Sequence, residues 1–177
     1  MFDPTIYENL KVVLEGAVYD LDLSGDILVT NRSDQIDMST LSRNYAIRFV
    51  LQNEEDSHAS PWAEFALTAG LEDLAAEILE RKPSSQGCTL TIRFGITMED
   101  PQNNCPAIAA SLASIWSGRP TITQTLSYVF GQREQCWHND VLLEFGRKLD
   151  ESHVGDFTGL LEHTVKTLSL LREKHAA

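Results

Sequence analysis

The sequence predicts an α+β domain in which an antiparallel or mixed sheet of about five to six strands carries helices on one face and ends in a long C-terminal helix. Several segments alternate apolar and polar residues, which indicates strands with one wet face. Other segments place apolar residues at helical spacing. Strands and helices do not alternate strictly along the chain, so a parallel doubly wound sheet is not expected.

The composition indicates a single domain, residues 1–177. A chain of 177 residues can bury a sizeable core without disulfides or structural metals. Its 42% hydrophobic and 23% charged residues are ordinary for a globular protein. No internal repeat, low-complexity tract or Pro/Gly-rich linker divides the sequence, so one domain is the economical interpretation.

The first element is predicted as a helix over about residues 4–15. Asp3 can accept hydrogen bonds from the free amides of the first turn, and Pro4 suits the first helical position. Gly16 can end the helix in the left-handed conformation. The apolar face of this helix consists of Ile6, Leu10, Val13 and Leu14.

Three strands are predicted next. Residues 17–23 alternate with period two, and a tight turn at residues 24–25 leads into a strand at residues 27–29. Residues 33–44 are polar and are expected to be irregular. Residues 45–51 restore the alternation and form the third strand.

A second helix is predicted between a polar loop at residues 53–57 and Lys82-Pro83. Ser60-Pro61 can start this helix, while Gly70 leaves open a break into two short helices because glycine costs about 1 kcal/mol relative to alanine. Residues 88–98 then form the clearest predicted strand of the chain. The apolar stripe of the helix consists of Leu67, Leu71, Leu74, Ala75 and Ile78.

A third helix is predicted to begin at Cys105-Pro106 and to end at Gly118. Residues 121–130 alternate and are predicted to be a strand, although Gln124 interrupts the apolar side. The segment 133–150 fits a helix and a short strand equally well, so both interpretations stay open.

The last element is predicted as a helix from about residue 154 to 174. His163 and Leu170 fall opposite its apolar stripe, which makes Leu170 a candidate exposed contact. The threonine-rich faces of residues 89–97 and 121–127 are expected on the exposed side of the sheet. The stripe consists of Phe157, Leu161, Val165 and Leu168, widened by Leu160, Thr164 and Leu171.

The three cysteines are widely spaced and form no C-x-x-C pair, so a disulfide framework or a structural zinc site is not expected. Cys88 lies on the apolar side of its strand and is expected in the core. Cys105 occupies the predicted N-cap of the third helix, where amides and the helix dipole stabilise a thiolate. Cys105 and His138 are therefore the candidate catalytic residues, while Cys136 and His138 are the candidate metal ligands.

No motif in the sequence specifies a reaction. G-x-S-x-G, a glycine-rich phosphate loop and H-E-x-x-H are all absent from it. No His or second Cys lies near Cys105 in the sequence to act as a base or resolving thiol. No cofactor is expected, and the sequence favours a protein that is not an enzyme.

The formal net charge of −12 is unevenly distributed. Residues 1–100 hold 18 Asp/Glu against 7 Lys/Arg, whereas residues 101–177 hold 8 against 7. An acidic field repels phosphate backbones, so nucleic acid is not an expected partner. A basic protein surface would be complementary, and a solvated surface without such a partner explains the charge equally well.

No membrane contact is expected. No segment approaches the ~20 consecutive apolar residues of a membrane helix. The start of the chain, Met1 to Pro4, also lacks the basic and then apolar pattern of a signal peptide. Together with three cysteines that suit a reducing compartment, these features predict a cytoplasmic protein.

Two classes of function fit the sequence. The favoured class is a non-catalytic interaction domain that self-associates, most simply as a homodimer, through a sheet face or the C-terminal helix. The alternative is a small-molecule-binding protein or enzyme with a site between the sheet and the helices. That site would involve Cys105 or the pair of Cys136 and His138.

Overall fold

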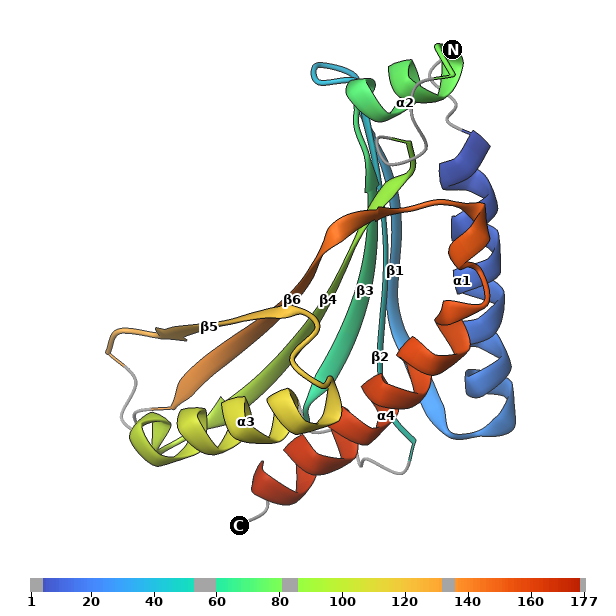
Figure 1. The fold of residues 1–177 in the computed structure, drawn as a ribbon. Helices are drawn as coiled ribbons and strands as arrows, with labels where there is room; N and C mark the ends of the chain where they lie inside the picture. The colour runs from blue at the N-terminus through green and yellow to red at the C-terminus, as the bar shows by residue number, and fades with distance from the viewer. Residues whose placement is uncertain (1–4, 53–59, 81–85, 132–135, 176–177) are drawn as a thin grey trace.

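The computed structural model describes residues 5–52, 60–80, 86–131 and 136–175 (Figure 1). Within them lie one six-stranded antiparallel sheet of order β1-β2-β3-β4-β6-β5 and four α-helices, which confirms the predicted class and the C-terminal helix. The predicted cap at Asp3-Pro4 and the loop at 53–57 lie outside the described residues. The elements are α1 (Thr5–Ser24), β1 (Ile27–Asp37), β2 (Ser42–Leu51), β3 (Trp62–Ala69), α2 (Leu71–Ile78), β4 (Cys88–Met98), α3 (Pro101–Ile115), β5 (Thr121–Tyr128), β6 (Trp137–Leu149), a short 3₁₀ turn (Glu151–His153) and α4 (Asp156–His175).

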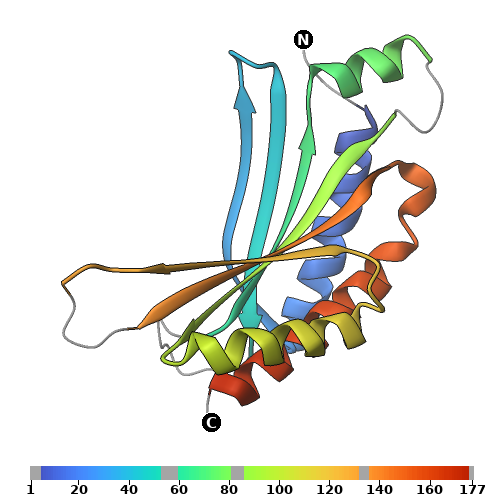
Figure 2. The same ribbon diagram turned by 60° about the vertical axis from the view of Figure 1, so that its left-hand side comes forward.

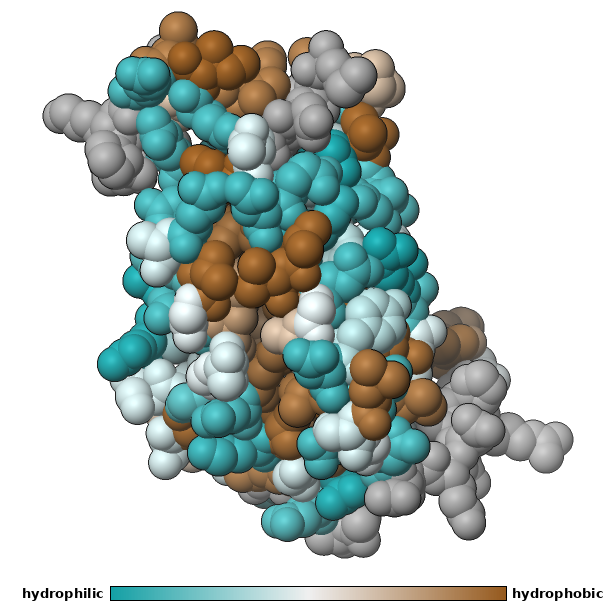
Figure 3. Space-filling model, turned by 90° about the vertical axis from the view of Figure 1, so that its right-hand side faces the viewer, coloured by the Kyte–Doolittle hydropathy of each residue, from teal (hydrophilic) through white to brown (hydrophobic). Residues whose placement is uncertain are grey.

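The helices α1, α3 and α4 lie on one side of the sheet (Figures 1 and 2). α1 and α4 pack on β1 to β4, whereas α3 runs beside α4 below β5 and β6. Figure 3 shows the helix-covered side, where hydrophilic side chains flank a band of apolar ones. The sheet bends so that its other face is concave, and no described helix covers that face. Among the described residues, no helix is both long and apolar enough to span a membrane.

The core lies between the sheet and these helices. Period-two alternation turns every second side chain of β2, β3 and β4 toward α1 and α4, and Phe49 stacks on Phe65 with ring centroids 6.2 Å apart. The threonines of β4 and β5 lie on the opposite face, as predicted. The largest fully buried side chains are Tyr7, Leu10, Leu14, Ile27, Tyr45, Ile47, Phe49, Phe65, Leu67, Ile92, Phe94 and Phe157.

The strand predicted at residues 17–23 is wrong, because α1 continues through them to Ser24. Tyr7, Leu10, Leu14 and Val18 are buried at helical spacing, so one face of the helix packs on the sheet from Tyr7 to Val18. Gly16 does not end the helix. The apparent alternation depended partly on Leu23, whose side chain is 84% exposed.

The helix predicted from Ser60-Pro61 onward is also wrong in its first half. Trp62–Ala69 is the strand β3, and only Leu71–Ile78 is helical. The break falls at Gly70, which is the N-cap of α2 and donates its backbone N–H to Asp73 Oδ2 at 2.9 Å. Leu67 belongs to the buried alternation of β3 and not to a helical stripe.

The irregular segment predicted at residues 33–44 is mostly strand. β1 extends to Asp37, β2 begins at Ser42, and Leu41 adopts a positive φ of 50° in the turn between them. β1 is polar because it is an edge strand with both faces largely exposed. The segment left open between helix and strand is β6, the strand Trp137–Leu149.

α3 begins one turn earlier than predicted. Asp100 is its N-cap, where the carboxylate accepts a hydrogen bond from Asn103 N at 3.2 Å, and Pro101 follows as the first helical residue. Cys105 therefore lies in the second turn and Pro106 inside the helix. The N-cap predicted at Cys105 is wrong because the earlier cap-and-proline pair starts the helix.

The buried stripe of α4 follows the prediction at Phe157, Leu161 and Leu168 and at the widening positions Thr164 and Leu171, whereas Val165 is half-buried. Leu170 is half-buried and packs against the core, so it is not the exposed contact that the spacing predicted. His163 is likewise half-buried, because its ring packs against Trp116 with centroids 5.4 Å apart. The helix thus buries a wider face than its apolar spacing indicated.

Candidate functional site

Cys88 is a core residue, as predicted. Its side chain is buried at the start of β4, and this burial raises the pKa of the thiol to about 12. A thiol with such a pKa holds almost no thiolate at neutral pH. Cys88 therefore contributes packing and not reactivity.

Cys105 lies between α3 and the sheet, in surroundings unlike those of an activated nucleophile. Its sulfur is 3.8 Å from Met98 Sδ and 3.7 Å from Asn139 Nδ2. Burial raises the pKa of this thiol, whereas a helix N-cap would have lowered it. The reason for considering Cys105 as a nucleophile is therefore lost.

Gln124 interrupts the apolar side of β5 because it links this strand to α3. Its Nε2 donates to the backbone oxygen of Cys105 at 3.0 Å, and its Oε1 accepts from Asn139 Nδ2 at 2.7 Å. Asn139 is buried, so the three residues form a polar bridge inside an apolar layer. This bridge holds the layer of β5 and β6 against α3.

The structure does not bring Cys105, Cys136 and His138 together. His138 lines a hollow of about 170 Å³ on the helix-free face, whereas the next residue, Asn139, contacts Cys105 on the helix side. Cys136 is half-buried just before β6 and does not line that hollow. Across the described ranges, no group of three or more His, Cys, Asp or Glu side chains is arranged to hold a metal ion.

The concave face of the sheet forms a larger open hollow of about 570 Å³. Side chains from β2, β3, β4, β5 and β6 line it, and most of them are small or polar, such as Ala66, Thr91 and Thr123. The exposed threonines are predictable from the sequence, whereas the concavity arises from the bend of the whole sheet. This hollow adjoins the one lined by His138, since Ser127 and Asp140 border both.

A ladder of alternating charge crosses this concave face on four neighbouring strands. Arg48 pairs with Glu64 at 2.9 Å, Glu64 lies opposite Arg93 in the sheet register, and Arg93 Nε donates to Asp140 Oδ1 at 3.2 Å. The guanidinium of Arg48 also lies 3.8 Å above the ring of Trp62. Because these four charges neutralise one another, the ladder gives a basic partner no acidic patch.

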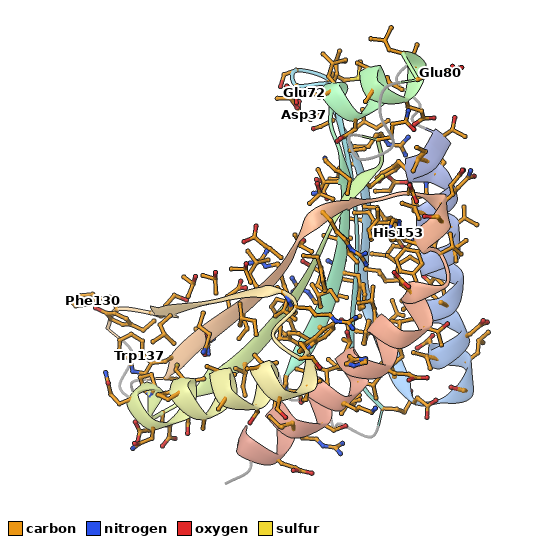
Figure 4. All side chains as sticks on the ribbon, viewed as in Figure 1. Asp37, Glu72, Glu80, Phe130, Trp137 and His153 are labelled. Atoms are coloured by element: carbon orange, nitrogen blue, oxygen red, sulfur yellow. The ribbon has the colours of Figure 1, made fainter. Side chains whose placement is uncertain are left out.

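The edge strand β5 is the most unusual surface of the chain. Among the described strands it pairs only with β6, and residues 120–132 of the sequence contain no charged side chain. Leu126 is 39% exposed, Tyr128 and Val129 are about half exposed, and Phe130 is 92% exposed at the tip of the hairpin (Figure 4). The unpaired backbone groups of this edge are therefore accompanied by apolar side chains.

This edge was not predicted from the sequence, although the absence of charge between Arg119 and Arg133 could have indicated it. Alternation alone cannot tell an edge strand from a central one, because pairing partners come from the topology. No family model, no curated protein and no solved structure matches the chain.

Proposed function

We propose that this protein is a non-catalytic interaction domain that forms a homodimer through the β5 edge of its sheet. The observation that carries the proposal is an exposed and uncharged edge strand in a chain of net charge −12. Natural sheets protect their edges with charges, prolines or bulges, because an open edge pairs with other chains. Pairing of β5 with a strand of another chain would explain why this edge has no such protection.

A second copy is the occupant that these features favour. Two β5 strands related by a two-fold axis pair antiparallel, which joins the two sheets into one and satisfies the open backbone groups of both. The contact brings no like charges together, although each chain is strongly acidic. It also removes Leu126 and the more exposed Phe130 from water.

The concave faces of the two copies lie side by side in such a dimer. Each face is lined by threonine, serine and alanine with mutually paired charges, which suits contact with a neutral, extended polypeptide more than with a strongly basic one. We also propose that the protein resides in a reducing compartment such as the cytoplasm, because its three cysteines are free thiols.

Sedimentation velocity at micromolar concentration tests the dimer. The sedimenting species is expected to be a dimer, with twice the 19.8 kDa mass of one chain. Leu126→Lys places a charge in the interface and should weaken dimerisation about a hundredfold, by ~3 kcal/mol. The matched control is Leu28→Lys, since Leu28 is 47% exposed on the opposite edge strand β1.

Two results would contradict the proposal. A wild-type chain that remains at 19.8 kDa at micromolar concentration does not self-associate. A dimer that Leu126→Lys and Leu28→Lys weaken equally, or that neither weakens, is not formed through β5. Circular dichroism of both variants checks that each monomer is folded.

A further inference from the structure

A third hollow lies between the sheet and the helices, near the Thr121 end of β5 and not near its Tyr128 end. Its volume is about 420 Å³, and it is bounded by the end of α3, the bulge of β6 and the first turns of α4. Its floor is aromatic, because Trp116 contacts both Phe145 and His163 with ring centroids 6.0 and 5.4 Å apart. Trp116 itself is fixed by a hydrogen bond from Nε1 to Thr167 Oγ1 at 3.1 Å.

Irregular backbone borders this hollow on two sides, and a glycine of α4 borders it on a third. Ser117 and Gly118 follow α3 with φ values of 52° and 63°. In β6, residues 145–147 face a single residue of β4, and Gly146 adopts a φ of 65°. On α4, a Cβ atom built at Gly159 would meet no atom within 4 Å, so the absence of a side chain there leaves real space.

The rim of the hollow is basic, in contrast to the rest of this acidic chain. Arg119 and Arg147 both border it, and Asp156 is its one lining carboxylate. Asp156 pairs with Arg147 at 3.2 Å, but both side chains are more than half exposed, so this pair is weak and can open. No described carboxylate forms an ion pair with Arg119.

We infer that this hollow binds a small aromatic anion, a flat ring that carries a phosphate or a carboxylate. The ring would lie against Phe145 and His163, where aromatic faces and edges are available for stacking. The anionic group would accept hydrogen bonds from Arg119 and Arg147, whose guanidinium groups suit phosphate and carboxylate oxygens. This inference does not depend on the proposed dimer.

Titration of the full chain with phenyl phosphate, followed by the indole N–H signals in NMR spectra, tests the inference. Three tryptophans give three such signals, and only Trp116 lines this hollow, whereas Trp62 and Trp137 serve as internal controls. The signal of Trp116 should shift in a saturable way. Benzoate distinguishes a carboxylate site from a phosphate site, and phenol shows how much the charge contributes.

Arg119→Gln and Arg147→Gln should each weaken phenyl phosphate binding about tenfold, because each removes one charge-assisted contact. Arg172→Gln, at an exposed arginine of α4 outside the hollow, is the matched control and should have no effect. Gly159→Leu should fill the space and abolish the shift while α4 stays folded.

The inference is overturned if the Trp116 signal does not move at millimolar phenyl phosphate. It is also overturned if phenol binds as tightly as phenyl phosphate and benzoate, or if Arg119→Gln and Arg147→Gln behave like Arg172→Gln. A shift that survives in Gly159→Leu would show that the ring binds elsewhere.

Discussion

The two edges of the sheet are built in opposite ways. β1 carries Arg32, Asp34 and Asp37, and a bulge at Thr30 shifts its register against β2. Its charges are tied to the helix beside it, since Asp34 pairs with Lys11 at 2.9 Å and Arg32 pairs with Glu15. β5 has no charge and no register shift against its neighbour, and its apolar side chains are exposed.

The edge strand β1 carries several features that disfavour pairing with another strand. Paired charges, a bulge and a helix that reaches the edge keep β1 from accepting another strand. A single lysine would protect β5 in a similar way, but residues 120–132 contain no lysine. The proposed dimer therefore uses β5, and β1 is the edge at which the sheet is expected to end.

The largest expected effect comes from the core that both edges share. Leu161 is buried in α4 beneath the centre of the sheet, so Leu161→Ala should lower the free energy of unfolding by about 2–5 kcal/mol. The half-buried Leu170 is the control, and Leu170→Ala should cost about 1 kcal/mol. Urea melts of the two variants measure both values. If Leu161→Ala leaves the free energy of unfolding unchanged, Leu161 is not buried and the assigned buried face of α4 is wrong.

A smaller effect is expected at the protected edge. Although burial opposes it, hydrogen bonds from Lys11 and Arg43 hold the pKa of Asp34 below its usual value. Asp34→Asn should cost about 1–2 kcal/mol near neutral pH, because it removes a charged acceptor shared by two cations. Leu28→Thr, on the same strand but outside the charge cluster, is the control.

The pH dependence of this effect has a definite sign. A carboxyl group whose pKa is lower in the folded chain stabilises the fold above its unfolded pKa of about 4, and this contribution is lost as the pH falls further. The difference in urea midpoint between wild type and Asp34→Asn should therefore be constant from neutral pH down to about 5 and shrink below about 4. A difference that grows on acidification would contradict the assigned ion pairs.

The smallest effect is expected in thiol labelling, which compares the centre of the sheet with its open end. Cys88 lies in the central strand β4, whereas Cys105 is linked to β5 through Gln124. Labelling of Cys105 should slow as protein concentration rises, because pairing of β5 suppresses local opening there. Labelling of Cys88 should be slower at every concentration, and its rate should not depend on concentration. If the labelling rates of Cys88 and Cys105 depend equally on protein concentration, this prediction is wrong.

The sequence predicted the elements whose alternation or helical spacing is supported by burial, such as β4 and α4. It failed where one apolar residue served two patterns. Leu67 fits a helical stripe with Leu71 and also the buried alternation of β3, and only the pairing of β3 between β2 and β4 decides between them. The prediction for the second half of α1 is wrong for a similar reason, because the exposed Leu23 completes an apparent strand-like alternation.

The candidate sites were harder to predict than the fold. Cys105 precedes Pro106, which suits a helix start, but α3 begins at the cap-and-proline pair Asp100-Pro101 five residues earlier. The hollow at Trp116 gathers residues from three elements, so no local pattern marks it. His138 and Asn139 are neighbours in β6, so their side chains point to opposite faces of the sheet. Asn139 contacts Cys105 on the helix side, and His138 therefore lies away from Cys105. This separation is not predictable while residues 133–150 fit both a helix and a strand.

Hydrogen exchange of the backbone amides tests the central claim most directly, because it reads each edge of the sheet separately. We expect the outward-facing amides of β5, residues 121–128, to gain protection as the protein is concentrated through the micromolar range. Those at the outer edge of β1, residues 27–37, should exchange at the same rate at every concentration. Concentration-dependent protection of β1, or a dimer whose β5 amides stay unprotected, would contradict the account.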